Sequence, residues 1–280
     1  MGFKEVGELR NIKLALVQFE SKMMDVKANV ERGLQFVKDA SNQGADLIVF
    51  PELFTTGYNA DIIGKNYYDL AETMEGETVS RFCDAAKDYN INIVAPIAIQ
   101  KDLPGVIYNS AVVIGRKGDV LGTFDKVHLW AGERFYFRAG DDYPVFDMDF
   151  GRIGIIICYD GGFPEASRVL ALRGAELILC PSAFPIWDKD MWDIYFRSRA
   201  LENACFVAGI NRVGKEKELH MFGNNKLANP RGKLLLDADM DVEQMQVVEI
   251  NLDDVFEYRK SVPYLKDRRI DTYKPICEIL

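Results

Sequence analysis

Histidine is scarce in this sequence of 280 residues, and long apolar runs are missing. The two histidines, His128 and His220, stand far apart, with no HExxH or His-x-His pairing. That argues against a histidine-rich metal site. No apolar run approaches the ~18 residues that span a bilayer, and the first residues lack the apolar segment of a secretory signal. We therefore expect no membrane association.

Basic residues are also in short supply. The sequence has 34 Lys and Arg against 43 Asp and Glu, a formal net charge of −9. A chain with this much negative charge is a poor candidate for binding phosphate backbones, which argues against nucleic-acid binding. Hydrophobic residues make up 48% and charged residues 28%, an ordinary globular composition that excludes wholesale disorder.

Cysteines are few and poorly spaced for pairing. There are five, at positions 83, 158, 180, 205 and 277, and none forms a CxxC pair. An odd count with wide gaps argues against a disulfide framework and against a structural zinc site. Free thiols are most simply explained by a reducing cytoplasm, which is the location we expect.

What the sequence does contain is an alternation of strand-like and helix-like segments. Compact apolar runs predict buried strands, and a helical period of apolar residues predicts helices. The predicted strands are Ile12–Phe19, Leu47–Phe50, Ile91–Gln100, Tyr108–Ile114, Val120–Asp125, Val145–Met148, Arg152–Ile157, Leu177–Cys180, Cys205–Asn211, Lys226–Ala228, Leu234–Leu236 and Gln246–Ile250. The predicted helices are Asp25–Ala40, Val79–Tyr89, Pro164–Arg173 and Trp192–Asn203.

This pattern mixes hairpins with strand–helix–strand units, so a purely parallel sheet does not fit. It predicts a layered α/β domain with mixed sheets and helices outside. No linker or repeat divides the chain, and we expect one domain over residues 1–280. Its last stretch, Tyr258–Leu280, is polar and punctuated by proline, and is either a surface arm or a tail that docks on a partner.

Cys158 is the first candidate for chemistry. It follows the apolar run IGIII and precedes YDGGFPE, where a strand breaks into a glycine-rich turn before a helix. Such a turn exposes a nucleophile, and nearby backbone N–H groups stabilise negative charge there. The alternative is that Cys158 is only a small core residue at the end of a strand.

Two charged residues also flank apolar strands. Glu52 lies in LIVFPELF, where an unpaired carboxylate would be costly to bury, and Lys126 lies in LGTFDKVHLW. Glu133 follows seven residues after Lys126 and could hold its ammonium in place. The alternatives are a structural salt bridge for Glu52 and an ordinary surface position for Lys126. Strand ends of one sheet tend to meet at one edge, which favours grouping these residues with Cys158.

Three separated motifs carry a resemblance to a known family. They are LIVFPELFTTGY over 47–58, FDKVHLWAGERFYFRAG over 124–140 and IGIIICYDGGFPE over 153–165. Supporting runs are RGAELILCPSAFP, RSRALENACFVAGINRVG and ANPRG. In this order the chain resembles the nitrilase superfamily of carbon–nitrogen hydrolases, in its amidase-like branch, over nearly its whole length.

The resemblance implies an α-β-β-α sandwich of two mixed sheets that pairs through helices into a homodimer. It places the family's catalytic triad on Glu52, Lys126 and Cys158, and its second glutamate on Glu133. Cys158 would attack the carbonyl carbon to form a thioester, and the reaction would need no metal and no organic cofactor. Glu52 would act as the base, and Lys126 with the backbone N–H of Tyr159 would stabilise the oxyanion.

The substrate is less clearly indicated than the chemistry. Where some branches have an arginine that meets a substrate carboxylate, this chain has Gly162. We therefore expect a neutral or weakly polar amide, unless Arg134 or Arg138 reaches the pocket. Tyr58, Phe184 and Trp187 are expected at the pocket mouth, although these aromatics could equally be core packing.

Three enzymatic functions and one non-enzymatic function remain open. The leading interpretation is an amidase that hydrolyses a small non-peptide amide to a carboxylate and ammonia. The alternatives are an N-carbamoyl amidohydrolase, which acts on ureido compounds, and a nitrilase, which the Cys-Tyr-Asp run disfavours. A non-catalytic scaffold is the last, and the complete triad argues against it.

Overall fold

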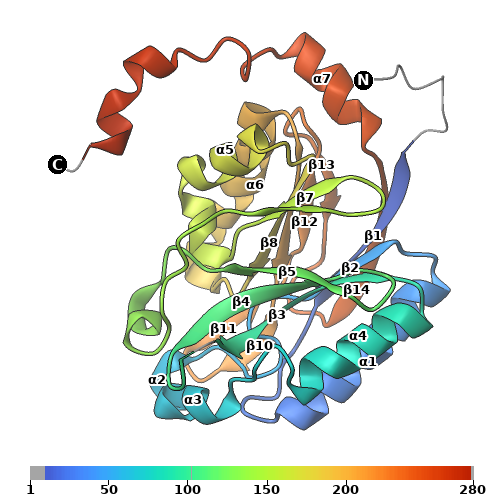
Figure 1. Ribbon diagram of the computed structural model, residues 1–280, viewed down its shortest axis with the longest axis vertical. Helices are drawn as coiled ribbons and strands as arrows, with labels where there is room; N and C mark the ends of the chain where they lie inside the picture. Colours follow the sequence, from blue (N-terminus) through green and yellow to red (C-terminus); the bar gives the residue numbers. More distant parts are fainter. Residues whose placement is uncertain (1–9, 102, 279–280) are drawn as a thin grey trace.

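Two six-stranded sheets form the centre of the computed structural model, which describes residues 10–101 and 103–278 (Figure 1). The first sheet has the order β14-β1-β2-β3-β4-β5 and the second β13-β12-β9-β8-β7-β6. The strands of the first sheet are β1 (Asn11–Gln18), β2 (Leu47–Val49), β3 (Asn92–Gln100), β4 (Ile107–Ile114), β5 (Val120–Asp125) and β14 (Gln244–Asn251). Those of the second are β6 (Val145–Asp147), β7 (Arg152–Ile155), β8 (Leu177–Ser182), β9 (Phe206–Asn211), β12 (Lys226–Ala228) and β13 (Leu234–Asp237).

Both sheets are mixed, with parallel strands at the centre and antiparallel strands at the edges. β1, β2 and β3 run parallel in the first sheet, as do β7, β8 and β9 in the second. The hairpin partners β4 and β5, and β6 and β7, are antiparallel. This arrangement confirms the predicted fold class.

Helices cover the outer face of each sheet. They are α1 (Val26–Asn42) and α4 (Glu77–Asp88) on the first sheet, and α5 (Pro164–Leu172) and α6 (Lys189–Asn203) on the second. The described residues also form the helices α2 (Ala60–Ile63), α3 (Tyr67–Leu70) and α7 (Asp253–Ser261). In Figure 1, α1 and α4 lie together on one side of the sandwich, and α5 and α6 lie on the other. The four main layers are therefore α-β-β-α.

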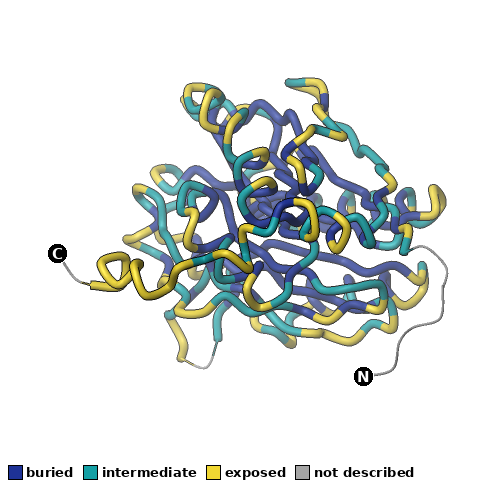
Figure 2. Tube along the Cα trace, turned by 90° about the horizontal axis from the view of Figure 1, so that it is seen from above, coloured by how far each residue is buried: buried dark blue, intermediate teal, exposed yellow. Residues whose placement is uncertain are grey.

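The apolar runs of the central strands follow from burial on both faces. Leu14 and Leu16 of β1 join the core shared by the two sheets, whereas Ala15 and Val17 face the core under α1 and α4. Strands covered on both sides read as continuous hydrophobic runs rather than as alternating ones. Figure 2 shows the resulting buried centre in dark blue.

The C-terminal segment differs from the rest of the chain in exposure. Residues 258–261 complete helix α7, and the described residues that follow are mostly exposed, as the yellow arm in Figure 2 shows. In Figure 1 this arm runs from α7 past α5. Residues 279 and 280, which end the arm expected from the sequence, lie outside the described residues.

Several elements were not predicted. The two-stranded hairpin of β10 (Val213–Glu216) and β11 (Leu219–Phe222) has only four residues in each strand, too few for a periodic apolar signal. The short helices α2 and α3 and the helix α7 were also missed. The hairpin bonds to the backbone of Tyr58 and Asn59.

Candidate active site

Glu52 and Lys126 both follow strands of the first sheet. Glu52 lies just beyond β2, and Lys126 directly follows β5. The Lys126 backbone is fixed on both sides: its N–H donates to the carbonyl of Asn109 at 2.9 Å, and its carbonyl accepts from the N–H of Gly140 at 2.9 Å. The ends of β2 and β5 thus position the Glu52 carboxylate and the Lys126 ammonium near each other.

The Lys126 ammonium lies between two carboxylates. Its Nζ is 2.7 Å from Oε1 of Glu52 and 2.7 Å from Oε1 of Glu133. The lysine and Glu52 are fully buried, and Glu133 is almost so. The structure therefore brings together three of the residues singled out in the sequence. Lys126 is not a surface lysine.

Each carboxylate has further donors that fix its orientation. Glu52 accepts from Asn109 Nδ2 at 2.7 Å and from the backbone N–H of Ala183 at 2.9 Å. Glu133 accepts from the Tyr58 hydroxyl at 2.6 Å and from the backbone N–H of Trp130 at 3.0 Å. These bonds satisfy oxygens that would otherwise be buried at a high cost.

Cys158 begins a short 3-10 turn, Cys158–Gly162, beyond the end of β7. The buried carboxylate of Asp160 ties this turn down. It accepts from the backbone N–H of Ile157 at 3.1 Å and from that of His128 at 2.8 Å. The strand-to-turn position expected for the nucleophile is therefore present, and the turn is linked to the segment that follows Lys126.

Three residues of the candidate site have strained backbone conformations. Leu53, Ala131 and Cys158 have φ values of 47°, 42° and 48°, in the left-handed region that non-glycine residues avoid. They lie next to Glu52, near Glu133 and at the thiol itself. Such conformations cost about 1–3 kcal/mol each and persist where the surrounding structure enforces them, often at functional sites.

Burial and the neighbouring charges set the protonation states. Burial alone would lower the pKa of Lys126, but Glu133 and Glu52 together outweigh it and raise that pKa well above its usual value. Burial raises the pKa of Glu133, and it also raises the pKa of Cys158 well above the ordinary range, with Glu52 adding to the latter effect and Lys126 opposing it. The resting thiol is therefore neutral and needs a base to become a nucleophile.

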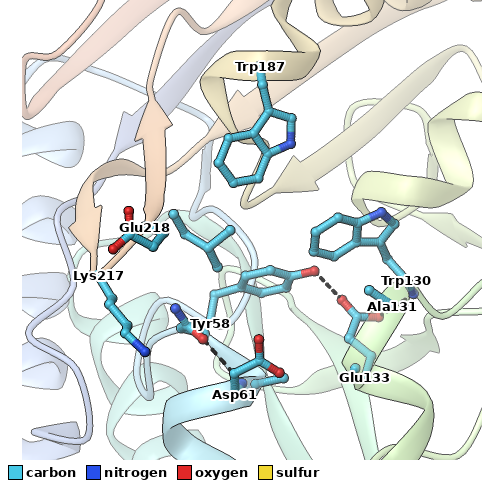
Figure 3. Close-up of a pocket in the computed structure, with 12 residues that line it drawn as sticks. Tyr58, Asp61, Trp130, Ala131, Glu133, Trp187, Lys217 and Glu218 are labelled. Carbon is cyan, nitrogen blue, oxygen red and sulfur yellow. Dashed lines mark hydrogen bonds between the residues drawn. The ribbon is translucent and has the colours of Figure 1, made fainter.

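Two cavities meet at the side chains of Tyr58 and Trp130. The first, of about 200 Å³, holds Cys158 and is lined by Tyr58, Trp130, Cys158, Tyr159, Ala183, Phe184, Pro185, Asp188, Met191 and Tyr195. The second, of about 330 Å³, is drawn in Figure 3 and is lined by Tyr58, Asn59, Ala60, Asp61, Trp130, Ala131, Gly132, Glu133, Trp187, Lys217, Glu218 and Leu219. Together they offer room for a small molecule next to the thiol.

The aromatic residues expected at the mouth divide between these cavities. Tyr58, Tyr159 and Phe184 line the Cys158 cavity, whereas Trp187 points into the second cavity from the side opposite Asp61 (Figure 3). Phe184 is nearly buried and Trp187 is 53% exposed. Phe184 therefore lies close to the thiol, and Trp187 lies further out.

Arg134 and Arg138 do not line either cavity. The side chain of Arg134 instead donates to the carbonyl of Leu129 at 3.1 Å. A different arginine, Arg199, contacts Gly162, the position at which some branches have an arginine. Arg199 donates to the carbonyls of Gly161 and Gly162, both at 3.1 Å. That guanidinium supports the turn rather than the cavity. No arginine among residues 10–101 and 103–278 lines either cavity.

Some contributors were missed from the sequence. Asn109, which holds Glu52, sits in the apolar strand β4, and a lone amide in such a strand is a signal for a buried polar contact. Arg212 lies in the run INRVG, which pointed to the family but not to a contact. Glu216 lies in the unpredicted hairpin, and only the fold brings it near Tyr58.

Within the described ranges, no group of three or more His, Cys, Asp or Glu side chains could hold a metal ion. Across the same part of the chain, no helix is long and apolar enough to cross a membrane.

The structure thus combines a layered α/β sandwich with a thiol, two carboxylates and an ammonium in segments that follow strands β2, β5 and β7. The family model for carbon–nitrogen hydrolases matches residues 13–260. The chain therefore belongs to the carbon–nitrogen hydrolase family of the nitrilase superfamily, whose members act on non-peptide C–N bonds.

Relatives cover nearly the whole chain. A probable nitrilase from Schizosaccharomyces pombe is 35% identical over 93% of this chain and 97% of its own length. An omega-amidase from Homo sapiens is 29% identical over 95% of this chain and 98% of its own. An N-carbamoylputrescine amidase from Arabidopsis thaliana is 29% identical over 96% of each.

Solved structures agree with this assignment. A carbon–nitrogen hydrolase from Helicobacter pylori superposes with a TM-score of 0.89 and 26% identity, over 96% of this chain and 99% of its own. An amidase from Nesterenkonia sp. has a TM-score of 0.80 and 28% identity, over 94% and 96% of the two chains. That amidase structure carries the acetamide moiety of fluoroacetamide on its active-site cysteine.

Proposed function

We propose that this protein is an amidase that hydrolyses a small, uncharged non-peptide amide to a carboxylate and ammonia, with Cys158 as the nucleophile. Glu52 is the general base and acid, Lys126 stabilises the oxyanion, and Glu133 holds Lys126 in place. The observation that carries the proposal is the fully buried ammonium held between two carboxylates beside the cavity of Cys158.

The reaction proceeds in two halves. Glu52 takes the proton of the thiol as the Cys158 sulfur attacks the carbonyl carbon, and the oxyanion forms beside Lys126 and the backbone N–H of Tyr159. Glu52 then passes that proton to the leaving nitrogen, the C–N bond breaks, and ammonia departs from a thioester. Water, deprotonated by Glu52, attacks the thioester, the C–S bond breaks, and Glu52 returns that proton to the sulfur of Cys158. The acid product ionises to the carboxylate as it leaves.

The raised pKa of Cys158 supports a base-assisted attack over a preformed thiolate. Lys126 alone would favour a thiolate, but it is shared by two carboxylates, and the three ionised groups together carry one net negative charge. A neutral thiol next to Glu52 suits proton transfer during attack.

The lining of the cavities supports an uncharged substrate near the thiol. Phe184 and Tyr195 are aromatic walls of the Cys158 cavity. Because no described arginine lines it, a carboxylated substrate would lack the bidentate partner that it prefers.

Ureido compounds are the second candidate. Among the exposed side chains that line the second cavity, Asp61 and Glu218 are negative and Lys217 is positive, so its exposed part carries one more negative than positive charge. This suits a distal amine better than a distal carboxylate, and one relative is named an N-carbamoylputrescine amidase. An N-carbamoyl amidohydrolase would use the same residues and release carbon dioxide with ammonia.

Ammonia release across a matched panel tests these alternatives. The panel contains small amides, their ω-carboxylated analogues, ureido acids, ureido amines and nitriles. We expect the highest kcat/KM for an uncharged amide. A preference for ureido amines would favour the second candidate, and a preference for carboxylated amides would contradict the uncharged-substrate proposal.

We also propose a cytoplasmic homodimer formed by a single-domain chain. The outer surface of α5 and α6 supports pairing because it exposes Leu172, Ile194 and Leu201, with Ile194 63% exposed. Light scattering on the purified protein should give about twice the 31.7 kDa chain mass. A monomeric mass would contradict this.

A further inference from the structure

The hairpin of β10 and β11 holds a buried carboxylate against the candidate site. Glu216, the last residue of β10, is 4% exposed. Its Oε2 accepts from the backbone N–H of Tyr58 at 2.9 Å and from that of Asn59 at 2.7 Å. In return, Asn59 Nδ2 donates to the Glu216 carbonyl at 2.8 Å. These bonds join the hairpin to the Tyr58 segment on both sides.

Arg212 completes this arrangement. Its Nη2 is 2.5 Å from Oε1 of Glu216, and its side chain is 1% exposed. Its Nε and Nη1 have no hydrogen-bond partner among the described residues, so Glu216 is the group that balances its charge. A buried ion pair gains little net stability because both charges lose their hydration. Fold stability alone is therefore a weak reason for this pair.

Hydrogen bonds connect Tyr58 to Lys126 through Glu133. The Tyr58 hydroxyl donates to Glu133 at 2.6 Å, and the same Glu133 oxygen lies 2.7 Å from Lys126 Nζ. Tyr58 also lines both cavities, and Figure 3 shows its ring between Lys217 and Glu133. A shift of the Tyr58 backbone would therefore move both the cavity wall and a ligand of Glu133.

We propose that Glu216, held by Arg212, is a positioning residue that fixes Tyr58 and through it the Glu133–Lys126 end of the catalytic cluster. The inference rests on the proposed function, in which Lys126 acts on the carbonyl attacked by Cys158. Glu216 bonds to neither the thiol nor Lys126, so it acts through the backbone of Tyr58 and Asn59. Displacements of about 1 Å at such a site can cost up to ~100-fold in rate.

A double-mutant cycle on the alkylation of Cys158 by acrylamide tests this. Peptide mass mapping follows Cys158 and, as an internal reference, the exposed Cys277. We expect Glu216→Gln and Tyr58→Phe each to slow Cys158 alkylation by roughly tenfold, and the double variant to be no slower than the slower single. Cys277 should react at one rate throughout. Multiplicative effects of the two substitutions would overturn the proposal.

Glu176→Gln is the matched control. Glu176 also accepts from an arginine, Arg10 at 2.8 Å, and from a backbone N–H, that of Arg152 at 3.1 Å, but it lines neither cavity. It should lower the melting temperature without changing Cys158 alkylation. If it slows Cys158 as much as Glu216→Gln does, the effect of Glu216 is general destabilisation and the proposal falls.

A second variant separates stability from positioning. Arg212→Met with Glu216→Leu replaces the ion pair by apolar groups and leaves the N–H groups of Tyr58 and Asn59 without their acceptor. We expect the variant to fold, with a melting temperature lowered by the two unpaired N–H groups, and to show slow alkylation of Cys158. Normal alkylation in this folded variant would overturn the proposal.

Lys126→Ala distinguishes a failure of this inference from a failure of the proposed function. If Lys126→Ala leaves the alkylation of Cys158 unchanged, the catalytic cluster itself is misassigned and the inference fails with it. If Lys126→Ala slows Cys158 while the cycle at Glu216 and Tyr58 is multiplicative, only the positioning role is wrong.

Discussion

Lys126 and Lys226 are both buried lysines held between two carboxylates, but they differ in the exposure of those partners. Lys126 lies 2.7 Å from Glu52 and from Glu133, whose side chains are 0% and 2% exposed. Lys226 lies 3.0 Å from Asp193 and 2.6 Å from Asp237, whose side chains are 41% and 55% exposed. By residue type the two clusters look alike.

The two clusters differ in how the pKa of a partner carboxylate is shifted. Partial burial would raise the pKa of Asp237, but its hydrogen bonds from Lys226 and Asn224 outweigh that and lower it. For Glu133 the burial is complete, and it wins over the attraction of Lys126, so that pKa is raised. The Lys226 cluster can therefore relax by exchanging partners for water, whereas the Lys126 cluster cannot. Preorganised charge of the second kind is what oxyanion stabilisation requires.

The sharpest test of this contrast is removal of each ammonium. Lys126→Ala should lower kcat by ~10²–10³, because an oxyanion donor is lost from a dry site. Lys226→Ala should leave kcat within about threefold and affect mainly the melting temperature. Steady-state kinetics and circular dichroism on both variants check this, and equal losses of kcat would contradict the distinction.

Replacement by arginine should separate the clusters again, with a smaller effect. Lys126→Arg should still lose roughly tenfold or more in kcat, because a planar guanidinium does not fit between two buried carboxylates as a compact ammonium does. Lys226→Arg should be tolerated, since its half-exposed aspartates can move. Kinetics on the folded variants decide the matter, and full activity of Lys126→Arg would show that charge alone suffices.

Acid should affect the Lys126 cluster through Glu133. Because burial raises the pKa of Glu133, kcat/KM should fall on the acid side at a pH above the usual range of glutamate, as the carboxylate that holds Lys126 is protonated. The Tyr58 hydroxyl lowers that pKa by its hydrogen bond. Tyr58→Phe should therefore move the acid limb to higher pH. A limb that stays in place, or moves to lower pH, would contradict this role of Glu133.

Among these tests, high salt should give the smallest difference between the Lys126 and Lys226 clusters. At about 1 M NaCl the Debye length is ~3 Å, and exposed charges are screened while buried ones are not. The difference in melting temperature between the unaltered protein and Lys226→Ala should shrink in high salt. The kcat ratio between the unaltered protein and Lys126→Ala should not change. A salt-dependent kcat ratio would indicate that water reaches Lys126.

The fold was largely predictable because its strands are apolar on both faces. β1, β4 and β8 are mainly apolar in sequence, and their boundaries fall within two residues of the sequence prediction. The β10–β11 hairpin gave no such signal, since each of its strands has only four residues and its contacts lie far away in the sequence. Its role depends on a meeting between Glu216 and Tyr58, which are 158 residues apart.

The grouping of Glu52, Lys126 and Cys158 was predictable for another reason: each of the three follows a strand within three residues. A buried charge at such a place needs a partner, and the opposite charges of Glu52 and Lys126 pointed to pairing. The sequence could not show which aromatic residue lines which cavity. Phe184 and Trp187 are three positions apart, yet they line different cavities, because the short turn after β8 separates them.

The central claim is that Cys158 carries the acyl group during turnover. The direct test is acid quenching of the protein during turnover of the best amide in the panel, followed by peptide mass mapping, with Cys158→Ala alongside. The account predicts the acyl mass on the peptide that contains Cys158, and neither the adduct nor ammonia release in Cys158→Ala. Turnover that persists in the folded Cys158→Ala protein, or an acyl group on another residue, would contradict it.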